Sequence, residues 1–313
     1  MIPAAAGCPS EDRRGLNRIP GRPGELISRI AVYGRMIKFS HTVFALPFAL
    51  SALVLAGREH GVTAAQIFWI LVAMVGARSA AMGFNRIADV GFDARNPRTA
   101  GREIPSGRLS TRAAMVFVAL SSAVFILAAA MLGRLPFLLS APVLGVLFLY
   151  SYAKRFTWLA HACLGFVISL APLATWIAVT GIFSWKILWL SLALMTYITG
   201  FDILYACQDV DFDRSQGLFS IPAHFGVRKA LWAARMIHAL AYASFLMVYV
   251  AFDMTGGFLL AAGLIGLMLV FEHWLTDPED LSRVHIAFFH VNSVISVTLL
   301  AGVLADEMIR RIG

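Results

Sequence analysis

The amino-acid sequence predicts an all-α fold, a multi-pass transmembrane helical bundle of about nine helices. Its 313 residues are 59% hydrophobic and only 14% charged, and the mean hydropathy is +0.76. The apolar residues form long runs, such as 117–132, 159–182 and 187–203, rather than the short stretches of a soluble core. Most of the chain must therefore face lipid or other apolar helices.

Each expected helix is an apolar run of about 20 residues, the length that crosses the hydrocarbon core of a bilayer. In chain order these runs are centred on Phe48, Val75, Val124, Leu144, Ser169, Met195, Leu246, Leu264 and Ile295. We expect residues 29–313 to form this transmembrane domain. Residues 1–28 are rich in Pro, Gly and Arg and lack an apolar central stretch, which predicts a disordered basic tail.

The formal net charge of +8 is explained by membrane orientation rather than by a nucleic-acid partner. The leader up to Lys38 carries seven basic residues and the segment 86–112 carries six, whereas Arg58, Arg134 and Lys186 stand nearly alone in the alternate connections. This asymmetry predicts a cytoplasmic N-terminus, an outer C-terminus and a place in the cell (inner) membrane. No nucleic acid is expected to bind.

Four connections on the predicted cytoplasmic side hold most of the polar side chains. They are residues 85–110, 151–157, 208–229 and 272–285. The opposite connections are brief and nearly uncharged, so we expect any chemistry at the cytoplasmic face. The first and third of these connections also share a faint repeat, because each begins with acidic residues four apart and reaches an Ile-Pro pair.

The acidic residues of these two connections have the spacing of a helical stripe. Asn85, Asp89 and Asp93 lie at i, i+4 and i+8, and Asp209 and Asp213 repeat the spacing in the third connection. Carboxylates at this spacing repel each other unless a cation lies between them. Mg²⁺ prefers hard oxygen ligands and phosphate oxygens. The five side chains are therefore candidate ligands of a Mg²⁺ cluster that bridges a diphosphate.

Basic side chains beside the two stripes are candidates to neutralise the remaining phosphate charge. They are Arg86, Arg98, Arg102, Lys154, Arg155 and Arg214. The competing interpretation is that the acids and bases are solvated interfacial residues or form salt bridges with each other. Two DxxxD copies beside two Arg clusters favour the metal and diphosphate site.

Three further polar residues are candidate substrate contacts. Arg78 lies within a predicted span, where it needs a partner: either a substrate carboxylate or a buried acid such as Asp202. Lys38 lies before the first span and either contacts acceptor or phosphate or extends to the lipid headgroups. Asn292 in the last span either forms an interhelical hydrogen bond or lines an acceptor pocket.

These motifs resemble the UbiA superfamily of intramembrane aromatic prenyltransferases, especially the 4-hydroxybenzoate polyprenyltransferases. Asn85, Asp89 and Asp93 look like the first motif of that family, NxxxDxxxD, and Asp209 and Asp213 look like its second, DxxxD. The stretches KRFT at 154–157 and RTAGREIPSG at 98–107 are also similar to that family. The resemblance implies a prenyltransferase in which the four aspartates are catalytic, Mg²⁺ is the cofactor, and a polyprenyl diphosphate and an aromatic acid are the substrates.

One stretch departs from the 4-hydroxybenzoate group. Members of that group commonly have Asp-Lys-Pro before the first helix, whereas this chain has IKFSHTVFALPFAL at 37–50. Together with ARSAAMGFNR at 77–86 and YACQDVDFD at 205–213, this looks like the branch assigned to menaquinone synthesis through futalosine. The acceptor implied there is a dihydroxynaphthoate instead of 4-hydroxybenzoate. The alternatives are a transferase of the same family that acts on a haem, chlorin or 1,4-dihydroxy-2-naphthoate acceptor and, from another class, a transporter with an intramembrane charge pathway.

Overall fold

The computed structural model describes residues 31–38, 42, 44–277, 279, 281 and 287–312, and these residues form helices and turns without strands. The predicted tail at 1–28 lies outside the described residues. The helices are α2 (Leu46–Ala56), α3 (Ala64–Ala88), α4 (Val90–Arg95), α5 (Thr111–Leu132), α6 (Arg134–Leu149), η2 (Tyr150–Arg155), α7 (Ala160–Thr180), α8 (Trp185–Ala206), η3 (Cys207–Asp209), α9 (Val210–Ser215), α10 (Ile221–Phe225), α11 (Val227–Ala251), α12 (Gly256–Trp274), η4 (Ala287–Val291) and α14 (Asn292–Ile312).

The predicted all-α membrane bundle is confirmed. Among the described residues, eight helices are long and apolar enough to cross a membrane, and α2 is a shorter apolar helix of 11 residues. Each of the nine expected centres falls within one of these helices. Large apolar side chains such as Leu120, Leu260 and Leu267 are exposed on the outer surface. That exposure fits a protein whose solvent is lipid.

Polar capping residues set where several helices begin. Thr63 and Gln66 form a reciprocal capping box at the start of α3, and the Ser110 side chain accepts a hydrogen bond from the Ala113 N–H at the start of α5. Ser220 does the same for the Ala223 N–H of α10. These caps satisfy backbone N–H groups that have no partner inside the helix.

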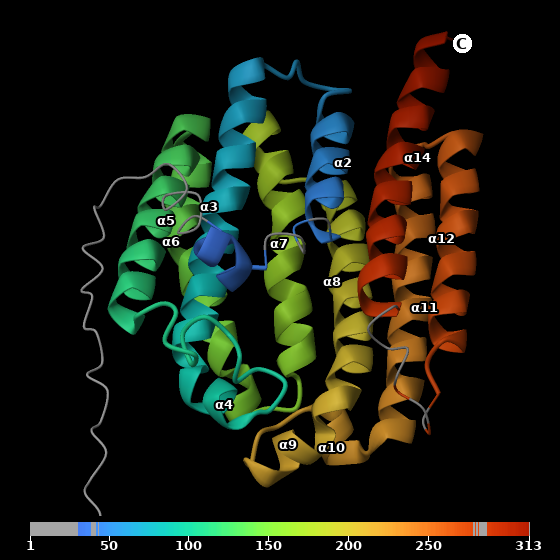
Figure 1. Ribbon diagram of the computed structural model, residues 1–313. Helices are drawn as coiled ribbons and strands as arrows, with labels where there is room; N and C mark the ends of the chain where they lie inside the picture. Colours follow the sequence, from blue (N-terminus) through green and yellow to red (C-terminus); the bar gives the residue numbers. More distant parts are fainter. Residues whose placement is uncertain are drawn as a thin grey trace, which may run out of the picture.

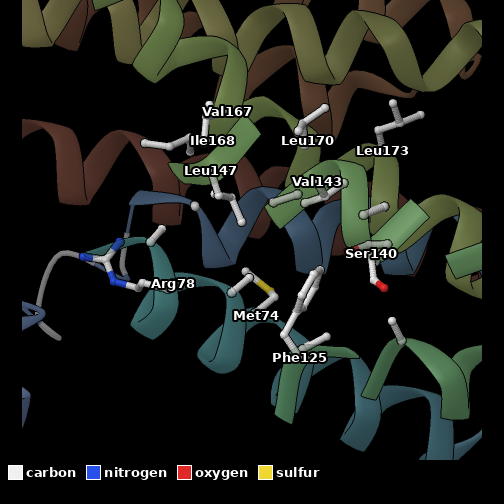
Figure 2. Close-up of a pocket in the computed structure, with 18 of the residues that line it drawn as sticks. Met74, Arg78, Phe125, Ser140, Val143, Leu147, Val167, Ile168, Leu170 and Leu173 are labelled. Carbon is white, nitrogen blue, oxygen red and sulfur yellow. The ribbon is translucent and has the colours of Figure 1, made fainter. Parts of the chain in front are cut away.

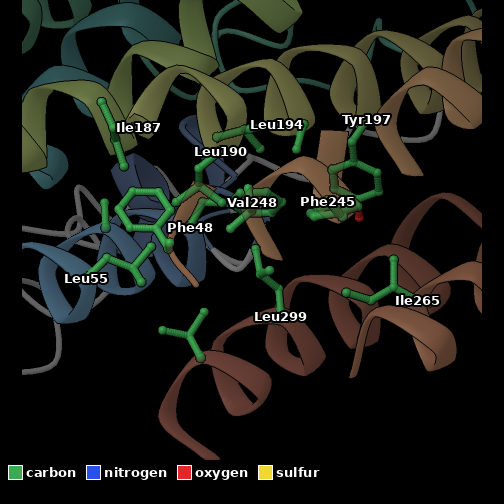
Figure 3. Packing of buried hydrophobic residues seen from close by; sticks show 14 of the residues in the cluster. Phe48, Leu55, Ile187, Leu190, Leu194, Tyr197, Phe245, Val248, Ile265 and Leu299 are labelled. Carbon is green, nitrogen blue, oxygen red and sulfur yellow. The ribbon is translucent and has the colours of Figure 1, made fainter. Parts of the chain in front are cut away.

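Helix α8 lies at the centre of the main hydrophobic core (Figure 3). Tyr197 of α8 packs on Phe48 of α2, and Phe48 also contacts Phe245 of α11. Leu299 brings α14 into the same cluster. The core thus joins the N-terminal and C-terminal ends of the chain around one helix.

The acid-bearing connections lie at one end of the bundle. In Figure 1, α4, α9 and α10 lie at the lower end, and the C-terminus of α14 lies at the opposite end. The fourth connection was predicted to begin at Glu272, but it begins after Trp274. Glu272 is a buried residue of α12, which extends to Trp274. We call the end that carries α4, α9 and α10 the polar rim.

Candidate functional site

The two acidic motifs occupy the same kind of helix break. Asp89 lies between α3 and α4 with φ −95° and ψ 5°, and Asp209 is the last residue of η3, directly before α9, with φ −107° and ψ 9°. This bridge region of backbone space is sparsely occupied, and active-site residues often lie in it. The predicted stripe therefore runs over two helical segments that meet at the aspartate, rather than over one regular helix. The Asp89 N–H still donates to Asn85 O at 2.9 Å and the Asp93 N–H to Asp89 O at 2.8 Å, so the turn-to-turn register continues.

The loop that follows the first motif contacts the second motif directly. Arg98 donates two hydrogen bonds to Asp209, from Nε to Oδ1 at 2.9 Å and from Nη2 to Oδ2 at 2.5 Å. Asn96 Nδ2 lies 3.4 Å from the same Oδ1. Arg98 Nη1 also donates to the hydroxyl of Tyr205 at 2.7 Å, and its guanidinium lies over the Tyr205 ring. The two motifs therefore lie together at the polar rim.

The first-motif carboxylates each pair with a cation. Arg102 Nη1 lies 2.6 and 2.8 Å from the two oxygens of Asp93. Arg155 Nη2 lies 3.4 Å from Asp89 Oδ1 and donates to Ala88 O at 2.6 Å. Asn85 Nδ2 donates to the other oxygen of Asp89 at 3.0 Å. Burial raises the pKa of the Asp89 carboxyl, and the neighbouring charge of Asp93 raises it further.

The second-motif carboxylate Asp213 is only 2% exposed and is less completely satisfied. Lys154 Nζ lies 3.5 Å from its Oδ2, but that oxygen accepts no hydrogen bond from the described residues. The Lys154 C=O accepts a hydrogen bond from the Phe219 N–H at 2.7 Å, which holds the KRFT stretch beside the third connection. A buried carboxylate with an unsatisfied oxygen is a suitable ligand for a hard cation.

The residues of the rim fit Mg²⁺ by their chemistry. In the described part of the chain, no three His, Cys, Asp or Glu side chains gather closely enough to hold a metal ion. Each of the four aspartates is instead paired with a cation. The donor set is nevertheless made of hard oxygens: the four aspartates and the amide oxygen of Asn85. Mg²⁺ usually takes one or two carboxylates and completes its shell with water and substrate phosphate.

A basic chamber of about 360 Å³ lies beside the first motif. It is lined by Arg35, Lys38, Arg86, Arg98, Thr99, Gly101, Arg102 and Glu103. Burial, followed by the charges of Arg86, Arg102 and Arg98, lowers the pKa of Lys38 to about 8. Arg86 is buried and donates from Nε to Met36 O at 3.3 Å. A chamber with five cations and one acid suits a polyanion.

An apolar cavity of about 330 Å³ lies next to the rim and deeper in the bundle, between α3, α5, α6 and α7. Figure 2 shows Arg78 at one end of it and Ser140 and Leu173 at the other. Arg78 Nη2 donates to Lys38 O at 3.0 Å, whereas its buried Nε has no hydrogen-bond partner among the described residues. The alternative pairing of Arg78 with Asp202 is wrong, because Asp202 Oδ2 lies 2.7 Å from His161 Nδ1.

The sequence profile of the UbiA prenyltransferase family matches residues 45–294, which is most of the chain. The chain belongs to the UbiA prenyltransferase family. As a family member it is a prenyltransferase enzyme and a multi-pass membrane protein, as the sequence predicts.

This UbiA-family chain is similar to curated relatives along nearly its whole length. It is 28% identical over 304 residues to the 4-hydroxybenzoate octaprenyltransferase of Pseudomonas fluorescens (strain Pf0-1), covering 95% of this chain and 98% of that protein. It is 27% identical over 245 residues to the mitochondrial 4-hydroxybenzoate polyprenyltransferase of Drosophila melanogaster, covering 74% of this chain but only 60% of that longer protein.

Solved structures share its fold. A UbiA homolog from Aeropyrum pernix K1 has a TM-score of 0.78 and 34% identity, covering 85% of this chain and 98% of that chain. A UbiA homolog from Archaeoglobus fulgidus, solved with GPP and Mg²⁺ bound, has a TM-score of 0.70, with 88% and 98% coverage. Its identity is only 19%, so this second likeness supports the fold alone.

Two predicted site residues of the UbiA-family chain make contacts other than with the paired acids of the site. Arg214 is exposed and donates from Nε to Ala223 O at 2.9 Å. Asn292 forms the interhelical hydrogen bond that was one of its two predicted roles, from Nδ2 to Glu272 Oε1 at 2.9 Å, and it is absent from the lining of the apolar cavity. Conversely, no role was predicted for Asn96 or Tyr205 from the sequence. Only the position of Tyr205, one helical turn before Asp209, signals its part in the site.

Proposed function

We propose that this chain transfers a polyprenyl group from a polyprenyl diphosphate to a carbon of an aromatic hydroxy acid, as a step in ubiquinone or menaquinone biosynthesis. The observation that carries the proposal is the pairing across the rim: Arg98 of the first half holds Asp209 of the second. A single site therefore contains four carboxylates, a set of cations and, deeper in the bundle, an apolar cavity. These are the parts needed for metal, diphosphate and hydrocarbon.

Asp89, Asp93, Asp209 and Asp213, with Asn85, would hold Mg²⁺. When bound, Mg²⁺ supplies positive charge that stabilises the departing diphosphate. Relatives solved with GPP or DMAPP and Mg²⁺ support this cofactor. The cations of the rim that now pair with the carboxylates can turn to the phosphate oxygens, where an arginine fork gives bidentate contacts. Lys38 and Arg86 lie in the basic chamber to bind the remaining negative charge.

The acceptor would lie at the mouth of the apolar cavity. Arg78 is the cation at that mouth, and a carboxylate of the acceptor would satisfy its unpartnered Nε. The electron-rich ring position beside the phenol attacks the allylic carbon as the diphosphate leaves, and the ring proton is then lost to a base. The cavity wall is apolar and excludes water, which would otherwise intercept the allylic cation.

The names of the curated relatives favour 4-hydroxybenzoate as the acceptor. The stretches at 37–50 and 77–86 favour a dihydroxynaphthoate instead. Both acids present a carboxylate and a phenol, so the site at Arg78 accommodates either by the same contact. We further propose that the polar rim faces the cytoplasm in a cell membrane, because the basic residues are concentrated at the connections of that end.

A turnover assay tests the proposal. Protein purified in detergent receives a polyprenyl diphosphate, Mg²⁺ and one of the candidate acceptors. These are 4-hydroxybenzoate, 1,4-dihydroxy-2-naphthoate and a second dihydroxynaphthoate isomer. We expect a prenylated aromatic acid with at least one of them. Asp89→Asn and Asp213→Asn should each lower kcat/KM by about 10²- to 10³-fold, the usual cost of removing one charge-stabilising group.

Asp211→Asn is the matched control, because Asp211 is an exposed acid of α9 between Asp209 and Asp213. It should leave turnover unchanged. Undiminished Mg²⁺-dependent activity in Asp89→Asn and Asp213→Asn would refute the assignment of the carboxylates. If no acceptor is turned over and substrate is taken up into vesicles, the protein is a transporter rather than an enzyme.

A further inference from the structure

Helix α8 carries a further acid inside the bundle, apart from the four rim aspartates. Asp202 lies seven residues before Asp209, which is about two helical turns, so the two carboxylates lie on one face of α8 and its continuation. The Asp202 side chain is 22% exposed, within a helix that is long and apolar enough to cross the membrane. An acid in such a segment is costly and marks a candidate functional residue.

Asp202 has a partner whose proton is fixed. His161 of α7 is fully buried, and its Nδ1 lies 2.7 Å from Asp202 Oδ2. The Ile221 N–H at the start of α10 lies 3.4 Å from His161 Nε2, and a backbone N–H can only donate. The proton of His161 is therefore on Nδ1 and is donated to Asp202. This contact uses Oδ2 and leaves Oδ1 to accept a proton from another source.

The depth of Asp202 in the bundle follows from the two acidic motifs. Asp89 and Asp209 have the same backbone conformation, and both lie at the polar rim. Met82, which lines the apolar cavity, lies seven residues before Asp89. Asp202 lies seven residues before Asp209, so it has about the same depth as Met82, roughly 10 Å from the rim. The carboxylate therefore lies at the level where the apolar cavity ends.

Helix α7 gives the same level independently. His161 is the second residue of α7, and Leu164, about one turn farther from the rim, lines the cavity. The hydroxyl of Tyr150, another lining residue, interacts electrostatically with both Asp202 and Arg78. Asp202 thus lies beside the space between the cavity and the rim.

An acceptor bound at Arg78 would extend toward this level. Arg78 lies at the end of the cavity (Figure 2) and four residues before Met82, which puts it about 6 Å farther from the rim. An aromatic ring with a carboxylate at one end and a phenol at the other has about the length of one helical turn. With the carboxylate on Arg78, the phenol end therefore reaches the level of Asp202. The ring carbon beside the phenol is the one that bonds to the prenyl group.

The rim aspartates already have other partners. Each is paired with a lysine or an arginine, and the proposed function assigns all four to Mg²⁺. Asp202 is paired instead with a histidine that donates its only ring proton. A base for a ring proton must reach that proton directly or through one water. Asp202 has the depth and the accepting oxygen for this role.

We propose that Asp202 is the base that removes the ring proton and that His161 positions it; the proposal rests on the proposed function. The ring carbon beside the phenol forms a bond to the allylic carbon. The bond from that carbon to the diphosphate oxygen breaks, and its electron pair leaves with the diphosphate. The ring C–H bond then breaks, its electrons restore the aromatic ring, and the proton passes to Asp202 Oδ1. Throughout, His161 donates to Oδ2 and keeps Oδ1 directed at the ring.

Asp202→Asn tests the base, because it keeps the shape of the side chain and removes the accepting oxygen. With an acceptor that the unmodified chain turns over, kcat should fall by about 10²- to 10⁴-fold, the usual contribution of a general base. Both KM values should change little. With deuterium at the alkylated ring position, the variant should show a larger isotope effect on kcat than the unmodified chain, because proton removal becomes the slow step. Asp211→Asn, at an exposed acid of α9, is the matched control and should change neither value.

Further variants separate the base from the residue that positions it. Asp202→Gly should regain turnover with added formate, which supplies the missing carboxylate, but not with chloride at the same ionic strength. His161→Leu removes the donor and should lower kcat by about 10- to 100-fold, the loss of one hydrogen bond to a charged group. His161→Asn places an amide N–H near the position of Nδ1 and should retain most turnover. His224→Gln, at an exposed histidine of α10, should equal the unmodified chain.

The outcomes distinguish this proposal from the proposed function. An unchanged kcat in Asp202→Asn, a fall in kcat without a larger isotope effect, or no recovery of Asp202→Gly with formate would overturn the assignment of the base. Equal losses in His161→Leu and His161→Asn would overturn the positioning role. Tm values and the KM for the diphosphate, matched to the unmodified chain, show that the variants are folded. An unmodified chain that turns over no acceptor would instead refute the proposed function.

Discussion

The contact between Arg98 and Asp209 joins the two halves of the site. Removing it should show, by comparing Tm with turnover, whether Asp209 has a structural or a catalytic role. The change is Arg98→Gln, Asp209→Asn and the two together. The contact has two charge-assisted hydrogen bonds, at 2.9 and 2.5 Å, and such bonds contribute about 1.5–3 kcal/mol each when fully buried. The Arg98 side chain is 33% exposed, so solvent screening reduces the total to about 2 kcal/mol.

Each single replacement should therefore destabilise the ligand-free protein by about 2 kcal/mol, since it leaves one charge without its partner. The double replacement should cost about 2 rather than about 4 kcal/mol, because neither charge is then stranded. For a protein of this size these values correspond to a lowering of Tm by about 4 °C in each case. Thermal unfolding in detergent, without Mg²⁺ or diphosphate, measures the shift.

Turnover should behave differently from stability. If Asp209 is a metal ligand, the double variant stays inactive although its Tm equals that of either single variant. Arg95→Gln provides the matched control, because Arg95 is exposed on α4 and donates to Gly91 O; its effect should add to that of Asp209→Asn. Additive Tm shifts for Arg98 and Asp209, or recovery of turnover in the double variant, would refute the reasoning.

Three further changes act on other parts of the molecule. The Lys38 ammonium has a pKa of about 8 and loses its positive charge as the pH rises through that value. In the unmodified chain, kcat/KM for the diphosphate should therefore fall above about pH 8, whereas the Lys38→Arg variant should stay active to higher pH. A pH–rate profile that is the same for both proteins would exclude Lys38 from diphosphate binding. At the end opposite the rim, Arg58 lies 2.5 Å from the buried carboxylate of Asp306. Arg58→Ala should therefore lower the free energy of unfolding by about 3 kcal/mol without altering KM, whereas Arg311→Ala, at an exposed position, should lower it less. Equal Tm values for these two variants would contradict this expectation. Arg78→Ala should raise KM for a carboxylate-bearing acceptor by about 10- to 100-fold, because one hydrogen bond to a charged group is lost. The KM for the diphosphate should stay nearly unchanged. A rise in the diphosphate KM alone would show that Arg78 binds the diphosphate rather than the acceptor.

The helices were predictable because each span is a long apolar run, and membrane solvation leaves a helix as the simplest way to satisfy its backbone. The exceptions are local. Periodicity continues through Asp89 and Asp209, so nothing in the spacing signals that the helices break there. Glu272 was placed in a connection because of its charge, yet it is buried in α12 and accepts a hydrogen bond from Asn292. A charge whose partner lies on another helix cannot be distinguished in sequence from a charge in water.

The site was predictable in its residue types but not in its pairings. Arg98 and Asp209 are separated by 111 residues, and their contact depends on which helices become neighbours. For the same reason the partner of Asp202 was predicted wrongly: His161 of α7 reaches it, whereas Arg78 of α3 donates to Lys38 O. The broken helix ends at Asp89 and Asp209 give the faint sequence repeat a structural counterpart, since both halves present their first aspartate in the same backbone conformation.

The pairing of acids with cations at the rim has a consequence for the order of binding. A metal ion alone must displace Arg98 or Arg102 from a carboxylate and leave a half-buried cation without its partner. A diphosphate alone must compete with the same carboxylates for those cations. When both bind, the metal takes the carboxylates and the phosphate takes the arginines, so no charge is stranded. We therefore expect each ligand to tighten the other by the same factor, as linkage requires. Calorimetric titration of Mg²⁺ with and without a non-hydrolysable prenyl diphosphate measures that factor, and equal Mg²⁺ affinities in the two titrations would show that the carboxylates are free of the arginines in solution.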